Sequence, residues 1–425
     1  MTRRGLAAYA ALGLPLAMAM LPIYMISPKF YGDSLGVDLA ALGAVLFLVR
    51  LLDTAQDPLI GRLVDFLHRR KSGWTSLVVV AGIALSGGFV MLFHPPAWSE
   101  RGLLVWLALS LVVVYTAHSL VTVCYLTWGA RLTDDPAGRT RVTAWREAFG
   151  LAGVVFASVL PAVWVSDSGP RAGYGQFAWV FVGVLAVGLL VTLWGAPRPT
   201  PEPAGALERW REALAPTAIR RLLWFYLFNA TSVAVPATLV LFVMDDALGL
   251  QEDAGLFLGL YFLAGMIALP GWVALSDRIG KERAWLSGAL LASCALLLTA
   301  WTEPGDVTRW AIVCLLSGAA LGADVALPPA MLADAIGPAH RKSTGLYFGL
   351  WALVGKLSLA LAAGLALPLV RFLGYQPGDA TTSDPLTVVY SFLPVALKVA
   401  AAVALWSLRR PLTLSCAASR TGSLP

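Results

Sequence analysis

The stretch RLLDTAQDPLIGRLVD, residues 50–65, places Arg50, Asp53 and Asp57 between two long apolar runs. Asp53 and Asp57 are four residues apart, so a helix would project both from one face about one turn apart, with Arg50 one turn earlier. Two close carboxylates raise each other's affinity for a proton, and a cation between them relieves their repulsion. The spacing therefore predicts a site that binds Na⁺ or takes up and releases H⁺. The alternative is a structural ion-pair cluster that only sets helix register.

Three further basic residues, Arg146, Lys356 and Lys398, also lie inside apolar runs. A charge at the centre of a membrane helix costs about 2.5–3.5 kcal/mol on insertion scales. We therefore expect Arg50, Arg146 and Lys356 to form a charge network with the aspartates, facing a polar cavity between two halves of the protein.

Other polar residues inside the apolar runs are candidates for a solute path. Asp324 precedes Pro328 and Pro329, which we expect to break their helix and free backbone carbonyls beside a cavity; packing is the alternative role for Asp324. His118 fits either a structural hydrogen bond or a proton relay. The side chains that could stack on a solute or hydrogen-bond to it are Tyr24, Tyr125, Trp128, Asn229 and Trp351.

The elements that must hold these residues are predicted by composition. Of the 425 residues, 58% are hydrophobic and 13% are charged, whereas a soluble chain carries about 25% charged residues. Apolar runs of about 20 residues without strict alternation predict membrane-spanning helices. The twelve predicted spans are 6–27, 37–61, 74–95, 102–129, 143–166, 176–196, 220–244, 254–276, 284–302, 308–333, 344–373 and 387–408.

The distribution of basic residues predicts the topology. Most of the 31 Lys and Arg residues fall in loops on one side of these spans, and few fall on the other side, namely Lys29, Arg101, Arg171, Arg309 and Arg371. By the positive-inside rule, both termini are cytoplasmic. The basic composition is then explained by topology and gives no support to nucleic-acid binding.

A polar stretch at 196–221 divides the chain. We expect residues 1–196 to form an N-terminal six-helix bundle, 197–219 a central cytoplasmic loop and 220–425 a C-terminal six-helix bundle with a short tail. Within the loop, Leu207, Trp210 and Leu214 share one helical face, which predicts an interfacial helix.

The two halves of the sequence contain similar motifs at corresponding positions. Pro58 is followed by Asp65 and Pro270 by Asp277, each at the end of the second span of its half, and Arg139 and Arg341 follow the fourth span of each half. Internal repeats of this kind are typical of transporters. We expect Asp65, Asp277, Arg139 and Arg341 to form salt bridges that stabilise one conformational state.

The chain resembles the glycoside–pentoside–hexuronide:cation symporters, the melibiose-permease-like branch of the major facilitator superfamily. The resemblance rests on the twelve spans, the central loop, residues 50–65, residues 124–150 and the segment 345–375 with its single Lys356. It implies an all-α membrane protein with two six-helix bundles.

The resemblance also implies roles for individual residues. Asp53 and Asp57 would bind the coupling cation, Gln56 and Ser119 would supply neutral oxygen ligands, and Lys356 would be a movable countercharge. Arg146 would match an arginine of the family's sugar site. Thr122 stands where that branch has a sugar-binding aspartate in its fourth helix, and the first span has no carboxylate, so a galactoside is not the expected substrate.

These patterns predict a secondary active transporter that couples Na⁺ or H⁺ to a small polar solute, a sugar or sugar acid, by alternating access. The alternatives are a lysolipid or amphiphile transporter on the same fold and a non-transporting membrane sensor. Metal-ligand spacing and nucleophile motifs that would indicate an enzyme are absent. We expect a monomer in a bacterial inner membrane, with a small solute, a monovalent cation and the bilayer as partners and with no cofactor, metal or nucleic acid.

Overall fold

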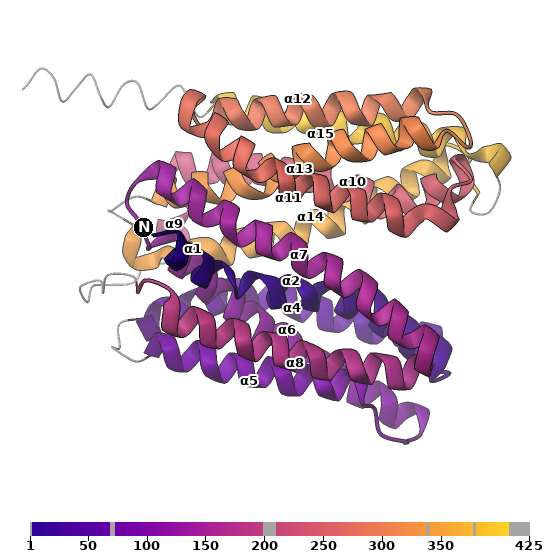
Figure 1. Cartoon of the computed structure of the whole chain (residues 1–425), viewed down its shortest axis with the longest axis horizontal. Coiled ribbons are helices and arrows are strands. Elements are labelled where there is room, and N and C mark those ends of the chain that lie inside the picture. Colours follow the sequence, from indigo (N-terminus) through magenta and orange to yellow (C-terminus); the bar gives the residue numbers. More distant parts are fainter. Residues whose placement is uncertain (1, 69–72, 199–209, 337–339, 377–379, 408–425) are drawn as a thin grey trace, which may run out of the picture. The chain divides into compact units, whose positions relative to one another are not determined.

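The computed structural model describes the chain except for residues 1, 69–72, 199–209, 337–339, 377–379 and 408–425. All regular elements in this described part are helical (Figure 1). The α-helices are α1 (Arg3–Ala10), α2 (Gly13–Leu21), α3 (Ser27–Lys29), α4 (Leu39–His68), α5 (Gly73–Phe93), α6 (Glu100–Ala130), α7 (Pro136–Ser168), α8 (Pro170–Gly195), α9 (Trp210–Ala213), α10 (Thr217–Phe242), α11 (Ala254–Ile279), α12 (Lys281–Leu298), α13 (Val307–Ile336), α14 (Thr344–Phe372) and α15 (Asp384–Ser407). Short π-helical and 3₁₀ segments adjoin them: η1 (Pro22–Ile26), η2 (Phe30–Ser34), η3 (Val243–Ala247), η4 (Gln251–Asp253), η5 (Thr299–Trp301), η6 (Arg341–Ser343) and η7 (Ala380–Thr382).

The chain forms two compact units. The first contains residues 1–207 together with 338–353, and the second contains residues 208–337 together with 354–425. The predicted division instead gave residues 338–353 to the C-terminal half. The start of α14 packs with the first unit because glycines allow backbone contact there: a Cβ on Gly61 would lie 2.3 Å from the carbonyl oxygen of Gly345.

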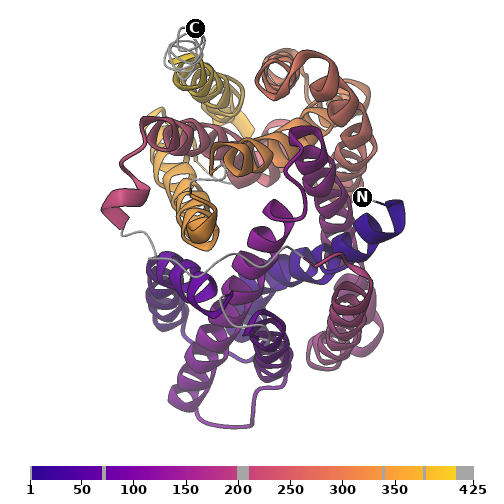
Figure 2. The same cartoon turned by 90° about the vertical axis from the view of Figure 1, so that its left-hand side faces the viewer.

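In the first unit, α2 packs on α7, α4 on α6, and α5 on both α6 and α8. Seen along the helix axes, these helices form a bundle (Figure 2). Phe89 and Phe181 stack with ring centroids 4.0 Å apart in its apolar core. A Cβ on Gly153 of α7 would lie 2.1 Å from the carbonyl oxygen of Leu14 in α2. Small residues thus bring α2 and α7 together, as is usual between membrane helices.

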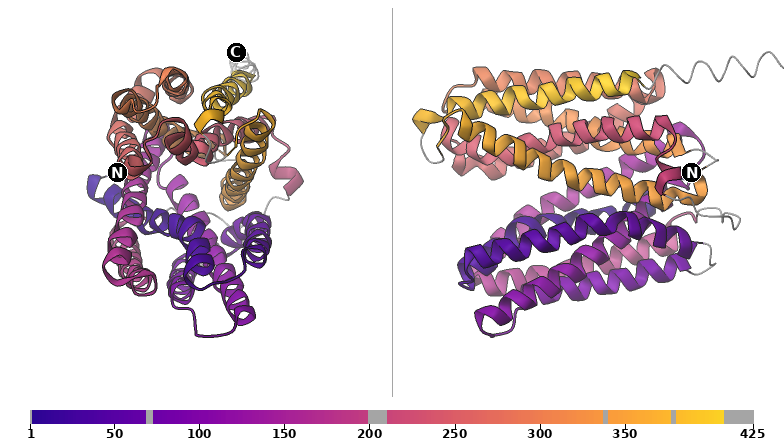
Figure 3. Two further views of the ribbon diagram at one scale, coloured as in Figure 1. Left: turned by 90° about the vertical axis from the view of Figure 1, so that its right-hand side faces the viewer. Right: turned by 180° about the vertical axis from the view of Figure 1, so that it is seen from behind.

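In the second unit, α10 lies along α15, and α13 packs on α11 and α12 (Figure 3). Trp310 and Val313 of α13 belong to the apolar core that α10 and α15 also build. The ring of Trp285 on α12 contacts Phe225 on α10 edge to face at 4.7 Å.

Within the described residues, eleven helical stretches are long and apolar enough to cross a membrane. The helix α4 is not among these stretches; it carries Arg50, Asp53, Asp57, Arg62 and Asp65. Its 30 residues would extend about 45 Å, more than the roughly 30 Å hydrocarbon core of a bilayer. Taken with α4, the helices confirm the predicted all-α membrane fold.

Two local predictions differ from the structure. The predicted break at Pro328 and Pro329 is wrong, since α13 runs unbroken from Val307 to Ile336 with both prolines inside it. Neighbouring helices can support a proline-containing membrane helix, and α13 has such neighbours in α11 and α12. In the central loop, the structure shows one helical turn, α9, and Leu207 of the predicted interfacial helix lies outside the described residues.

Candidate functional site

The helix α4 places Asp53 and Asp57 in the interior of the first unit, where they are 2% and 0% exposed. Two donors reach the same carboxylate oxygen, Asp53 Oδ1: the amide of Gln56 at 3.2 Å and the hydroxyl of Ser119, on α6, at 3.3 Å. Three of the four predicted cation-coupling residues are therefore in direct contact. Asp57 lies one turn along α4, and a Cβ on Gly349 of α14 would be 2.6 Å from its backbone carbonyl oxygen.

Sequence reasoning missed one member of this group. The hydroxyl of Thr116 on α6 donates to Gln56 Oε1 at 2.9 Å and so fixes which end of the amide faces Asp53. Thr116, Ser119 and Thr122 follow one another at intervals of three residues along α6, which places three hydroxyls on one helical face. The buried hydroxyl of Thr122 has no hydrogen-bond partner in the described part of the chain. The i, i+3, i+6 spacing was the available signal for this hydroxyl row.

An aromatic pair accompanies the positive charge of Arg50. Its guanidinium lies 4.4 Å from the centroid of the Tyr24 ring, close enough for a cation–π interaction. Tyr24 in turn lies 5.9 Å from the ring of Tyr115 on α6. The Tyr24 hydroxyl is within electrostatic range of Arg50, Asp53 and Asp57, so these charges form one cluster.

Arg146 belongs to a different cluster from the predicted network. On α7 it forms an ion pair with its neighbour Glu147, a residue that sequence reasoning missed. Its other electrostatic neighbours are the hydroxyls of Tyr9 and Tyr125. Those two tyrosines donate hydrogen bonds to each other's backbone carbonyls at 2.9 and 2.8 Å.

Several solute-path candidates have backbone partners in the structure. Trp128 is buried and donates to the carbonyl of Pro197 at 2.8 Å. His118 donates from Nε2 to the carbonyl of Leu16 at 3.0 Å, which fits the structural alternative. Trp351 is buried in the first unit, and Lys356 lies in the part of α14 that belongs to the second unit.

At the end predicted to be cytoplasmic, Asp65 holds the first turn of α14. Its two carboxylate oxygens accept the backbone N–H groups of Gly345 and Leu346, each at 2.8 Å. Arg131, the residue that follows α6 and caps it, was missed in the sequence; it lies 3.4 Å from Asp65 and donates to the Arg341 carbonyl at 2.8 Å. A carboxylate at a helix N-terminus is favoured by the unpaired N–H groups and the helix dipole.

The other predicted conformational residues have different partners. Arg139 and Arg341 both pair with Asp134, a mostly exposed carboxylate. Asp277 is itself exposed near the end of α11. In the second unit, an ion pair joins Lys281 of α12 to Asp334 of α13 at this end of the helices.

A second buried cluster lies in the second unit and contains two of the predicted solute-path residues. Lys398 on α15 donates to Asp324 on α13 at 2.5 and 2.6 Å and to Asn229 on α10 at 2.7 Å. Trp285 on α12 donates to Asp324 at 3.0 Å. Sequence reasoning missed Lys398 and Trp285, although Lys398 stood out as a basic residue inside the last span.

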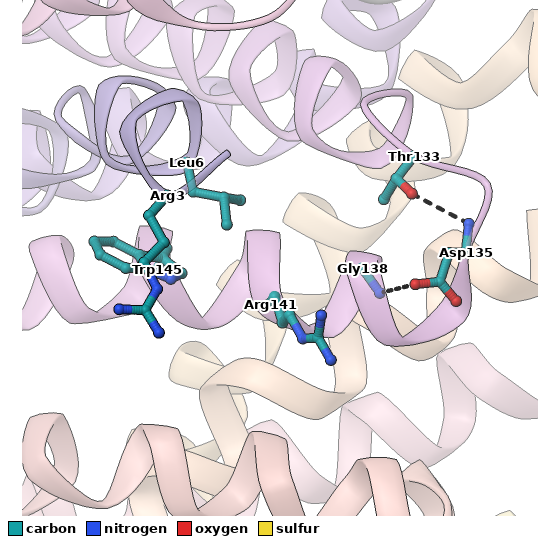
Figure 4. Close-up of a pocket in the computed structure, with 7 residues that line it drawn as sticks. All are labelled: Arg3, Leu6, Thr133, Asp135, Gly138, Arg141 and Trp145. Carbon is teal, nitrogen blue, oxygen red and sulfur yellow. Dashed lines mark hydrogen bonds between the residues drawn. The ribbon is translucent and has the colours of Figure 1, made fainter. Parts of the chain in front are cut away.

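A pocket of about 380 Å³ opens at the end of the first unit that is predicted to be cytoplasmic (Figure 4). There Asp135 begins α7 as its N-cap and accepts the N–H of Gly138 at 2.8 Å. Its lining residues are Arg3, Leu6, Thr133, Asp135, Gly138, Arg141 and Trp145. It shares none of these residues with the Asp53 cluster, so it is a separate, basic surface pocket. In the described residues, groups of His, Cys, Asp and Glu that could hold a metal ion are not found.

Comparison with other proteins places this geometry in a family. The family described as MFS/sugar transport protein matches residues 6–412. A glucuronide carrier protein homolog of Escherichia coli (strain K12) is 24% identical over 411 residues, covering 92% of this chain and 88% of that protein. An isoprimeverose transporter of Lactiplantibacillus pentosus is 21% identical over 389 residues, covering 86% of this chain and 80% of that protein.

Solved structures share the fold. An outward-facing bacterial homologue of the iron transporter ferroportin matches with a TM-score of 0.70 and 16% identity, covering 95% of this chain and 97% of that one. The fucose:proton symporter of Escherichia coli matches with a TM-score of 0.68 and 12% identity, covering 95% and 98% of the two chains. The chain is thus a membrane transporter and not an enzyme, and it belongs to the MFS/sugar transport family of the major facilitator superfamily, in the glycoside–pentoside–hexuronide:cation symporter branch.

Proposed function

We propose that the protein is a cation-coupled symporter for a small polar solute, a sugar or sugar acid, and that Asp53 and Asp57 bind the driving Na⁺ or H⁺. The observation that carries this proposal is the contact of Gln56 and Ser119 with one buried carboxylate oxygen of Asp53, one turn from a second buried carboxylate. Carboxylate and hydroxyl oxygens are ligands that a hard cation prefers.

Binding of a cation would relieve the repulsion between the two carboxylates. One guanidinium, Arg50, lies within the same electrostatic environment as Asp53 and Asp57. One Na⁺ or one proton shared by the carboxylates would reduce their negative charge. Neutralisation inside the membrane lowers the cost of the conformational change that carries the site from one side to the other.

The solute class is supported by the relatives. Their printed names are a glucuronide carrier protein homolog, an isoprimeverose transporter and a putative glycoside/cation symporter. Thr122, whose hydroxyl lies next along α6 from Ser119, would be the nearest group of the hydroxyl row to hydrogen-bond a solute. We further propose that the protein acts as a monomer in the inner membrane, with both termini cytoplasmic.

The test uses the purified protein in liposomes with an imposed Na⁺ or H⁺ gradient, screened over sugars, sugar acids and lysolipids. Asp53→Asn and Asp57→Asn should each abolish accumulation of solute against its gradient, because an amide neither titrates near neutral pH nor carries the required charge. Exchange of solute at equal concentrations should persist in part. Asp38→Asn is the matched control, since Asp38 begins the same helix by accepting the N–H of Ala41, a role that Asn fills equally well.

Wild-type, ion-dependent accumulation by either cluster variant would remove that aspartate from the coupling site. Ion-driven accumulation of lysolipids but not of sugars would replace the proposed solute class.

A further inference from the structure

The buried cluster of the second unit is built from four helices and is polar throughout. Asn229, Trp285, Asp324 and Lys398 come from α10, α12, α13 and α15, in that order. The ammonium of Lys398 lies within 2.7 Å of three oxygen atoms and 5.6 Å from the Trp285 ring centroid. Asn229, Trp285 and Lys398 are at most 3% exposed, and the Asp324 side chain is 6% exposed, so all four side chains are buried.

A packing role alone is a weak explanation for this pair. Buried ion pairs contribute little net stability compared with well-packed apolar side chains of similar volume. Ionisable residues inside membrane spans are by contrast commonly functional. Phe225, one turn before Asn229 on α10, packs on the Trp285 ring, so an apolar side chain already borders the cluster.

The donors of the cluster are arranged around a carboxylate. Lys398 donates hydrogen bonds to both carboxylate oxygens of Asp324, and the indole N–H of Trp285 donates to one of them. A charged ammonium and a fixed N–H converging on two oxygens would bind any carboxylate placed there, whether it belongs to the protein or to a solute. The Asp324 side chain thus occupies a site whose chemistry suits a carboxylate ligand.

On this basis we propose that Lys398 and Trp285 form the recognition site for the carboxylate of an anionic solute, which replaces Asp324 when Asp324 takes up a proton. The proposal rests on the proposed symport function and specifies its solute class. The proton goes from solution to an oxygen of Asp324, and no covalent bond is made or broken in the solute. The positive charge of Lys398 is balanced throughout, first by Asp324 and then by the solute.

The groups that face Asp324 come from four helices. They are Lys398 from α15, Asn229 from α10, Trp285 from α12 and, within electrostatic range, the phenol of Tyr261 from α11. Of these groups, Lys398 is the one that carries a charge near neutral pH. Binding of a carboxylate that requires one proton becomes weaker by about tenfold per pH unit wherever Asp324 is ionised in the empty site.

The experiment measures binding of D-glucuronate and its neutral analogue D-glucose to the purified full chain between pH 6 and pH 8. Wild-type protein should bind glucuronate at least tenfold more tightly than glucose, and the difference should shrink as the pH rises. Lys398→Gln should remove the preference for the acid. Asp324→Asn should retain glucuronate binding and lose its pH dependence, because an amide cannot be ionised.

Lys281→Gln is the matched control, since it removes the lysine of a separate ion pair in the second unit, to Asp334. It should leave both the acid preference and its pH dependence unchanged. Should Lys398→Gln fail to fold with Asp324 left uncompensated, the double variant Lys398→Gln/Asp324→Asn restores a neutral site, and it too should lack the acid preference.

Equal binding of glucuronate and glucose by wild-type protein, or an acid preference that survives in either Lys398 variant, would overturn the inference. Absence of glucuronate binding would overturn it as well. These outcomes differ from failure of the proposed function, which would be the absence of ion-driven accumulation for every sugar and sugar acid in the screen. Ion-driven accumulation of neutral sugars alone would leave the coupling site in place and remove the carboxylate site.

Discussion

At the scale of single residues, the two buried clusters differ in how a charge is balanced. In the first unit, Arg50 faces an aromatic ring, and Asp53 is satisfied by neutral donors, Gln56 and Ser119. In the second unit, Lys398 and Asp324 are paired directly. Carboxylate and hydroxyl oxygens meet in the Asp53 cluster, which suits a cation. Ammonium and indole N–H donors meet in the Lys398 cluster, which suits an anion.

Ser119→Ala tests the contribution of the hydroxyl to the cation site. Its removal should weaken the apparent affinity for the driving cation by about tenfold, corresponding to one hydrogen bond to a charged group of about 1.5 kcal/mol, while leaving the maximal rate of uptake similar. The measurement is solute uptake into liposomes as a function of Na⁺ concentration or pH. Ser110→Ala, on the same helix, removes a hydroxyl that bonds to the Trp106 carbonyl and should leave cation affinity unchanged. Equal effects of the two variants would argue against a ligand role for Ser119.

The sequence allowed the contacts within and next to α4 to be predicted better than those elsewhere. Asp53, Asp57 and Gln56 lie within one turn or so of each other on one helix, and helical periodicity fixes their common face. Partners on separate helices, such as Lys398 and Asp324, are 74 residues apart, and no local pattern specifies which helices meet. Glu147 was missed as the partner of Arg146 for a different reason: the two residues are adjacent on α7, and adjacent side chains on a helix do not normally face each other.

At the scale of elements, α14 is the helix whose place differs most from the predicted division. Its first turn is held in the first unit by Asp65, Arg131 and the close approach of Gly345 to Gly61, while its remainder from residue 354 belongs to the second unit. Hydropathy predicted the helix and its length, because both depend on composition over about 20 residues. The start of α14 belongs to the first unit because of backbone donors and glycine contacts, which hydropathy does not register.

Asp65→Ala should destabilise the first unit strongly. The change leaves the Arg131 guanidinium buried without its carboxylate and two N–H groups of α14 without their acceptor, and breaking a buried pair costs about 3–5 kcal/mol. Thermal unfolding of the purified protein in detergent measures the loss. Asp134→Ala removes a carboxylate whose side chain is 75% exposed, and its cost should stay below about 1 kcal/mol. A cost for Asp65→Ala as small as that of Asp134→Ala would show that the cap contributes little.

Gly153→Ala tests the contact between α2 and α7. The new methyl group would lie 2.1 Å from the Leu14 carbonyl oxygen, so the helices must separate, at a cost of about 1–3 kcal/mol. Gly43→Ala on α4 is the matched control, because a Cβ there meets nothing within 4 Å, and Ala is the better helix former. The unfolding temperature should fall for Gly153→Ala and stay the same or rise for Gly43→Ala. An equal response of the two variants would contradict close packing of α2 on α7.

At the scale of the whole molecule, composition determined most of what could be predicted. In lipid, a long apolar run must form its backbone hydrogen bonds internally, which predicts a helix. The number of such runs and the repeated motif indicate the superfamily. The eleven apolar helices and α4 agree with that prediction. The predicted break at Pro328 and Pro329 was wrong because the effect of a proline depends on neighbouring helices, which a single sequence does not show.

Topology is the remaining property of the whole molecule, and the distribution of basic residues predicts it. With both termini cytoplasmic, Glu212 on α9 should face the cytoplasm, and Glu303, in the loop between α12 and α13, should face outward; both side chains are exposed. Single cysteines at these positions, in a variant with Cys124, Cys294, Cys314 and Cys416 replaced, can be labelled in intact cells with an impermeant maleimide. Glu303→Cys should react and Glu212→Cys should react only after the membrane is made permeable. The reverse pattern would invert the topology, because loop charge sets the orientation of all the helices together.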